Sequence, residues 1–268
     1  MEPSNESSAN QPPPMEVHHH GHVHEQKKWK EYVFQFIMLF FAVFLGFLAE
    51  NLREKVAEKN IEREYIESFV SDLKSDYALA SRNEISIFDQ TKRIDTLQDL
   101  LFSDFKNDPK KDSLTRKCYQ MLLYIQSFYS EFFDERTVTQ LLSSGSMRLI
   151  KKQGVADSIV SYHSHIKFVD GQKQLYINSI TTGVQSMYNV YDISLLKTIF
   201  SRNRFYYLDF DSVQCNLLTT EPSELKKFIA ILETTKIVAF TYKEYLVNMK
   251  TRSERLQEFL ANKYDLEE

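Results

Sequence analysis

The hydrophobic pattern begins with an apolar run at residues 32–49, YVFQFIMLFFAVFLGFLA, in which Gln35 is the only strongly polar side chain and no residue is charged. As a helix, the run would be about 27 Å long, close to the thickness of the hydrocarbon layer of a bilayer. It has no polar face, whereas a surface helix of a soluble domain has one. Trp29 and Tyr32 stand at its start, where aromatic side chains favour the headgroup layer. We therefore predict a transmembrane helix over residues 31–50.

A cleaved signal peptide is the main alternative interpretation of such a run. The apolar segment of a signal peptide lies close to the first residue and ends in small residues at the cleavage site. Here a polar tail comes first, and the run leads into Glu50-Asn51-Leu52-Arg53, which lacks a small-residue cleavage pattern. We therefore expect the helix to remain as an anchor whose first partner is the lipid bilayer.

Helical periodicity continues beyond the apolar run. Residues 50–105 contain neither glycine nor proline, and apolar side chains recur at spacings of three, four or their sums. These side chains are Leu52, Val56, Ile66, Val70, Leu73 and Tyr77. The simplest prediction is one helix that leaves the bilayer and continues as far as Phe105. Ser81 with Glu84 is an alternative start of a fresh helix, with a kink near residue 80.

Three further helical stretches follow a loop at 106–113, KNDPKKDS. The second stretch is expected from Leu114 to about Ser143, with a break around Asp134–Arg136 as an alternative. Gly145 is placed to cap its carboxyl end.

The third stretch extends from about Gly154 to Ile193. The last begins at Thr220–Glu224, where Pro222 occupies an early helix position, and ends near Lys263. The intervening residues are less regular, and residues 204–211, RFYYLDFD, have some strand character.

The composition favours an all-α fold. Glycine and proline number six each, and four of the prolines lie in the first 14 residues, so the remainder is almost free of helix breakers. A β-sandwich or barrel needs many turn residues, and nucleotide-binding α/β folds need glycine-rich loops. We predict that residues 51–268 form an antiparallel bundle of about four long helices, the first of which continues the transmembrane helix.

Charge and cysteine content exclude further classes. With 33 basic and 37 acidic residues the net charge is −4, which offers no electrostatic basis for binding nucleic acid. The two cysteines, Cys118 and Cys215, are too few for a disulfide scaffold or a Cys-rich zinc module. Both adjoin apolar stretches, as buried thiols do.

Residues 1–30 form a predicted disordered tail rich in histidine. Its polar, proline-rich sequence cannot bury enough surface to offset the loss of chain entropy. Imidazole nitrogens bind Zn²⁺ and Ni²⁺, and a cluster of five histidines offers several of them. These histidines are His18, His19, His20, His22 and His24. The alternative is a solvated tail that binds these metals only adventitiously; no other cofactor is predicted.

Recognisable catalytic patterns are absent from the helical stretches, which contain no Glu-x-x-His, His-Glu-x-x-His, Cys-x-x-Cys, phosphate-binding loop or serine elbow. His163 and His165 lie two residues apart and point to different faces of a helix. Asp209 and Asp211 alternate in a loop, which is a common arrangement. No catalytic residue is therefore predicted.

The leading functional hypothesis is a membrane-anchored, non-enzymatic interaction or scaffold protein. Two alternatives stay open: a ligand-sensing bundle that signals through a partner protein, and an enzyme whose site sequence patterns do not reveal. Ala42 and Gly46 lie four residues apart in the apolar run, and small residues at this spacing let membrane helices approach closely. A second copy of the chain or another membrane protein is thus an expected partner.

Three segments of the chain resemble a family of bacterial single-pass membrane proteins, common in Bacteroidetes-type genomes and known as a domain of unknown function. The segments are FLGFLAEN, REKVAEKNIEREYIESFVSDLKSD and FFDERTVTQLLSSGSMRLIKKQGVADSIVSYHSHI. The last contains a Leu-x-Ser-Gly-x-x-x-x-Ile pattern at Leu142, Ser144, Gly145 and Ile150. The resemblance covers roughly residues 31–80 and 130–168 and implies no activity and no catalytic residue.

Orientation in the membrane does not follow from the basic residues. Three lysines precede the apolar run and four basic residues follow it, namely Lys27, Lys28 and Lys30 against Arg53, Lys55, Lys59 and Arg63. The family resemblance implies an inner-membrane protein with its N-terminus in the cytoplasm and its helical domain in the periplasm.

Overall fold

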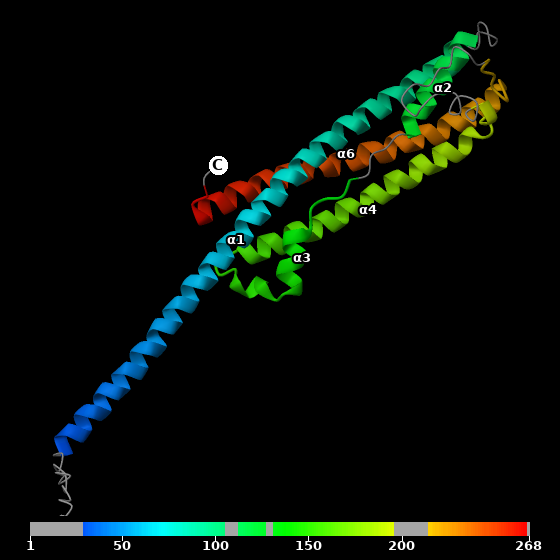
Figure 1. Ribbon diagram of the computed structural model, residues 1–268. Coiled ribbons are helices and arrows are strands. Elements are labelled where there is room, and N and C mark those ends of the chain that lie inside the picture. Colours follow the sequence, from blue (N-terminus) through cyan, green and yellow to red (C-terminus); the bar gives the residue numbers. More distant parts are fainter. Residues whose placement is uncertain (1–28, 105–111, 127–130, 196–213, 267–268) are drawn as a thin grey trace, which may run out of the picture. The chain divides into compact units, whose positions relative to one another are not determined.

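The computed structural model describes residues 29–104, 112–126, 131–195 and 214–266 (Figure 1). The helices are α1 (Trp29–Asp99), η1 (Leu100–Asp104, a π-helical turn), α2 (Asp112–Gln126), α3 (Arg136–Ser143), η2 (Ser146–Leu149, a 3₁₀ turn), α4 (Val155–Met187) and α6 (Pro222–Tyr264). Over these residues the only β-type pairing is an isolated bridge between Tyr191 and Leu217. The predicted all-α class is confirmed.

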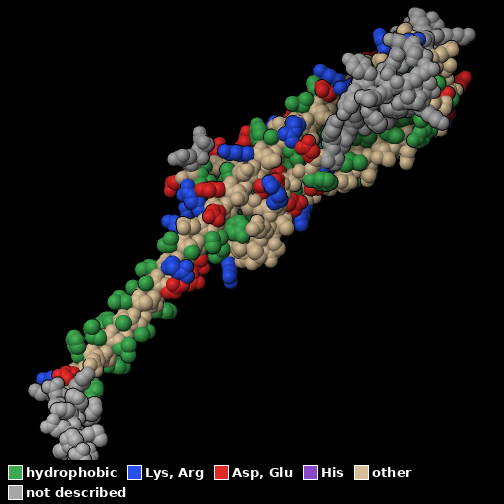
Figure 2. Space-filling model, viewed as in Figure 1, with side chains coloured by type: hydrophobic (Ala, Val, Ile, Leu, Met, Phe, Trp, Pro, Cys, Tyr) green, Lys and Arg blue, Asp and Glu red, His purple; other side chains and the backbone are tan. Residues whose placement is uncertain are grey.

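The chain divides into two compact units, residues 1–55 and residues 56–268. The described part of the first unit is helical, and its large apolar side chains from Phe34 to Leu48 are each 42–69% exposed. Figure 2 shows these hydrophobic side chains around the first part of α1. In the described part of the chain, α1 is the one helix long and apolar enough to cross a membrane. It carries the apolar run identified in the sequence.

Three long helices make up most of the second unit: α1 from Val56 onward, α4 and α6. Helix α4 runs parallel to α1, because its Tyr162 and Tyr176 contact Asp76 and Gln90, which precede them by the same 86 residues.

Helix α6 runs antiparallel to α1. Its early Lys236 pairs with Asp95, whereas its late Tyr264 pairs with Glu62. Between these contacts, Lys250 pairs with Glu84. A three-helix arrangement with two parallel members follows from these contacts (Figure 1).

The core forms along the predicted apolar stripes. Ile66 and Leu73 of α1, Ile166 of α4 and Leu246 of α6 are completely buried, and they belong to one hydrophobic cluster. A second cluster joins η1, α2 and the facing ends of α4 and α6, and it includes both cysteines, which are buried. The first two stripe members, Leu52 and Val56, lie outside the core and are exposed.

Helix boundaries differ from the expectations at two places. The predicted second stretch divides into α2 and the short α3, with residues 131–135 non-helical, as the alternative break allowed. The third helix ends at Met187, earlier than expected, whereas the continuous α1 and the start of α6 at Pro222 agree with the sequence. The finer expectation of about four long antiparallel helices is not confirmed. The proposed strand at 204–211 lies outside the described residues.

Candidate functional site

Helix α1 buries three carboxylate side chains on its inner face. The exposed fractions of Glu62, Asp72 and Asp76 are 6%, 4% and 1%. Their spacing places them on the same side of the helix as Ile66 and Leu73, where apolar side chains are the rule. A buried carboxylate is costly unless hydrogen-bond donors compensate for lost water.

The donors come from one segment, residues 131–151, here named the α3 arm because it contains α3. The backbone N–H of Asp134 donates to Asp76 Oδ1 at 2.7 Å, and that of Thr137 donates to Asp72 Oδ2 at 3.2 Å. The backbone N–H of Lys151 donates to Glu62 Oε1 at 2.9 Å. Each buried acid of α1 therefore holds one point of the arm's backbone.

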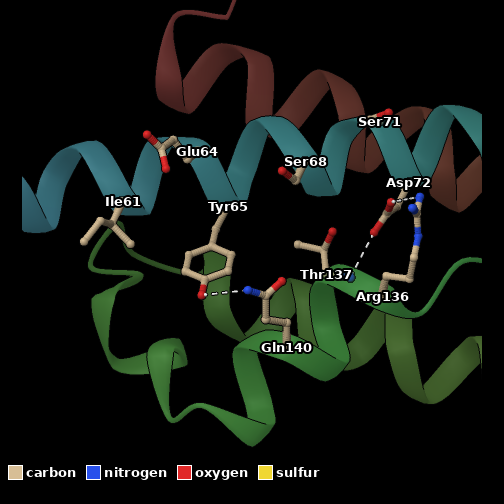
Figure 3. Close-up of a pocket in the computed structure, with 9 residues that line it drawn as sticks. All are labelled: Ile61, Glu64, Tyr65, Ser68, Ser71, Asp72, Arg136, Thr137 and Gln140. Atoms are coloured by element: carbon tan, nitrogen blue, oxygen red, sulfur yellow. Dashed lines mark hydrogen bonds and ion pairs between the residues drawn. The ribbon is translucent and has the colours of Figure 1, made fainter.

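Asp72 serves as a helix cap supplied from another helix. The N-cap residue of α3 is Glu135, whose side chain makes no capping bond. The first N–H groups of a helix need acceptors, and a negative charge there also interacts favourably with the helix dipole. Asp72 satisfies both needs at Thr137, as Figure 3 shows.

Side chains of the arm add further contacts. Arg136 forms an ion pair with Asp134 at 2.6 Å and lies 3.5 Å from Asp72. His163 Nδ1 of α4 lies 3.2 Å from Glu135 Oε2. Near the start of the arm, the buried Lys173 of α4 donates to the carbonyl of Glu131. The non-helical stretch before α3 therefore makes polar contacts with both α1 and α4.

Tyrosine hydroxyls from two other helices donate further hydrogen bonds to two of the three acids. Tyr162 Oη of α4 donates to Asp76 Oδ2 at 3.0 Å, and Tyr264 Oη of α6 donates to Glu62 Oε1 at 2.6 Å. Burial is the largest cause raising the pKa of Asp76, to about 7, and it also raises the pKa of Asp72. The hydrogen bond from Arg136 lowers the pKa of Asp134, which is more exposed.

A polar groove of about 540 Å³ lies between α1 and α3, beside Asp72 (Figure 3). It is lined by Ile61, Glu64, Tyr65, Ser68, Ser71, Asp72, Arg136, Thr137 and Gln140. Gln140 Nε2 donates to Tyr65 Oη at 3.5 Å, which links the two helices that line the groove. The nine lining residues offer hydrogen-bonding groups and one guanidinium, and none of the nine is a cysteine or a histidine.

The residues singled out in the sequence do not include the three buried acids. The metal-binding prediction at His18, His19, His20, His22 and His24, and the pair Asp209 and Asp211, lie outside the described residues. Within the described residues no group of three His, Cys, Asp or Glu side chains is arranged to hold a metal ion. His163 is buried beside Glu135, and burial lowers the pKa of His165.

Sequence reasoning missed the three acids. The available signal was an acidic residue at a stripe position of a helix that otherwise presents apolar side chains, as at Asp76 three residues after Leu73. Nothing in the sequence points to their partners in the arm, because those partners are backbone N–H groups.

The chain was compared with protein-family models, curated proteins and solved structures, and none of them matches it.

Proposed function

We propose that this protein is a membrane-anchored, non-enzymatic interaction or scaffold module. The observation that carries the proposal is the use made of the buried acids on α1. Glu62, Asp72 and Asp76 accept hydrogen bonds from the chain's own backbone, so they serve to shape the arm. In an enzyme, such groups converge on one cavity where a substrate can reach them. Of these three acids, Asp72 lines the groove beside α3, and Glu62 and Asp76 do not.

The first unit supplies the anchor in this proposal. Its exposed apolar side chains from Phe34 to Leu48 match a hydrocarbon environment and would be costly in water. We place the helix in the inner membrane, with the N-terminus in the cytoplasm and the second unit in the periplasm, as the family resemblance implies.

Cysteine labelling in intact cells tests the anchor and its orientation. One variant carries Asp108→Cys, beyond α1, and the matched variant carries Ser8→Cys, before it. Cys118 and Cys215 are buried, so the folded background should not react. We expect an impermeant maleimide to label Asp108→Cys in cells with a permeable outer membrane, and to label Ser8→Cys only after lysis. The reverse pattern would place the second unit in the cytoplasm.

Self-association through the anchor is the interaction we propose first. Ala42 and Gly46 form a small-residue surface. Within the described residues, a Cβ placed on Gly46 would meet no atom within 4 Å apart from its chain neighbours and the adjacent backbone of its own helix. A larger side chain at Gly46 therefore disturbs a partner rather than the fold.

Co-expression of two differently tagged copies tests this. We expect the copies to co-purify in detergent, Gly46→Leu to abolish co-purification, and Phe44→Leu on the opposite helix face to leave it intact. Co-purification that survives Gly46→Leu would refute close packing at the glycine. Failure of the unmodified copies to co-purify would refute self-association and leave a different membrane protein as the partner.

A further inference from the structure

Asp76 lies where three parts of the second unit meet. Its Oδ1 accepts the backbone N–H of Asp134 in the α3 arm, and its Oδ2 accepts the hydroxyl of Tyr162 in α4. From α6, the hydroxyl of Ser253 donates to the carbonyl of Leu73 at 2.6 Å and also interacts with the Tyr162 hydroxyl. With an exposed fraction of 1%, the carboxyl group is closed off from water while the arm is in place.

This network accommodates a neutral carboxylic acid without losing a hydrogen bond. A proton on Asp76 Oδ2 can be donated to Tyr162 Oη, which in turn donates to Ser253 Oγ, while Ser253 donates to the Leu73 carbonyl. Asp76 Oδ1 continues to accept the N–H of Asp134. Each polar group in this series of hydrogen bonds, from Asp76 through Tyr162 to Ser253, keeps a partner, as a buried network requires.

The surroundings of Asp76 stabilise its ionised form less well than its neutral form. The charged groups around it are Asp72 on α1 and Asp134, Glu135 and Arg136 on the arm. The guanidinium of Arg136 is 83% exposed and already paired with Asp134. On α4, His163 faces Glu135. A negative charge on Asp76 is thus opposed by the charges of Asp134 and Asp72.

We propose that the α3 arm is a proton-coupled latch, in which closing the arm on α1 and α4 takes up one proton at Asp76. With the arm open, water reaches the carboxyl group, which then has the ordinary pKa of an aspartate. With the arm closed, burial raises the pKa of Asp76 to about 7. The closed arm therefore binds the proton more tightly than the open arm.

The sign and size of the effect follow from linkage. Between the ordinary pKa of 3.8 and about 7, the closed state holds a proton that the open state has lost, so the closing constant falls about tenfold for each pH unit. Above about pH 7 both states are ionised and the dependence ends. The total loss is on the order of a thousandfold. The arm is thus tight in mildly acidic conditions and loosest at neutral pH and above.

Hydrogen exchange measured on the full chain in detergent micelles tests the latch. The protection of the arm amides of Asp134 and Thr137, corrected for intrinsic exchange rates, reports the closing constant from pH 5 to pH 8. We expect protection to fall about tenfold per pH unit up to pH 7 and to level off above it. Asp76→Asn mimics the neutral acid, since its Oδ1 accepts from Asp134 and its Nδ2 donates to Tyr162. We expect its protection to vary less than threefold over the same range.

Two controls separate the latch from other causes. Asp89→Asn removes the same charge from an exposed position of α1 and should retain the full fall. His163→Gln removes the imidazole beside Glu135 and should also retain it.

Several results would overturn the proposal. They are a flat profile in the unmodified protein, a fall that persists in Asp76→Asn, and a fall that disappears in His163→Gln. Equal protection at the arm amides and at the core amide of Ile166 in α4 would also do so, because the arm would then open only when the whole bundle unfolds. The unmodified protein alone decides the first and last of these, even if a variant fails to fold.

Discussion

The hydrogen bond between Tyr264 and Glu62 joins the last turn of α6 to α1, across 202 residues of sequence. Both side chains are buried, with exposed fractions of 6%, and the two oxygens are 2.6 Å apart. Tyr264→Phe removes the hydroxyl alone, because the ring and the ammonium of Lys152 4.1 Å from its centroid remain. The variant therefore isolates one bond to a buried carboxylate.

The expected magnitudes follow from the number of donors that each variant leaves without an acceptor. A hydrogen bond to a charged group contributes about 1.5–3 kcal/mol, so Tyr264→Phe should lower the free energy of unfolding by about 2 kcal/mol. Glu62→Ala leaves both the Tyr264 hydroxyl and the Lys151 N–H unpaired, and should cost about 3–4 kcal/mol. The double variant should cost less than the sum, by about 1–2 kcal/mol, since one bond cannot be lost twice.

Urea unfolding of the full chain in micelles, followed by circular dichroism at neutral pH, gives all four free energies of this double-mutant cycle. Tyr188→Phe is the matched control, because Tyr188 is 56% exposed, and it should change stability by less than about 0.5 kcal/mol. A coupling energy near zero between Glu62 and Tyr264 would show that the buried acid is satisfied by the arm alone. The account of the acids as shared acceptors would then be wrong.

Three further substitutions make independent tests by the same unfolding assay. Gly171→Ala on α4 should stabilise the protein by about 0.5–1 kcal/mol, because the new methyl group meets open space and alanine favours helix; a loss would mean that the helix is strained there. Gly145→Ala should instead destabilise by about 1 kcal/mol, since residue 145 has a φ of 70°, and a neutral result would contradict that conformation. Tyr119→Phe should cost about 1–3 kcal/mol, because its hydroxyl accepts the N–H of Asp192 at 2.8 Å and donates to the carbonyl of Asn216 at 2.9 Å; unchanged stability would show that water replaces it.

The sequence by itself determined the elements whose causes are local. A packed helix needs a segment with little glycine or proline and apolar residues spaced three or four apart. Both features can be read from consecutive residues. This is why the long α1, the start of α6 at Pro222 and the glycine cap at Gly145 agree with the structure. The apolar run at residues 32–49 is likewise a property of consecutive residues.

The tertiary structure decided which segments meet. Nothing local distinguishes a helix α4 parallel to α1 from an antiparallel one. The break before α3 also depends on acceptors elsewhere, because Asp76 and Asp72 bind N–H groups of Asp134 and Thr137 that a continuous helix would have used internally.

The candidate site shows most clearly which features cannot be predicted from the sequence. That Glu62, Asp72 and Asp76 occupy the inner face of α1 could be read from their spacing. Their roles could not, because the donors from the arm are backbone N–H groups, which nearly every residue carries and which no residue type identifies in the sequence. Which amide reaches which carboxylate depends on how the arm packs, and that packing exists only in the folded chain.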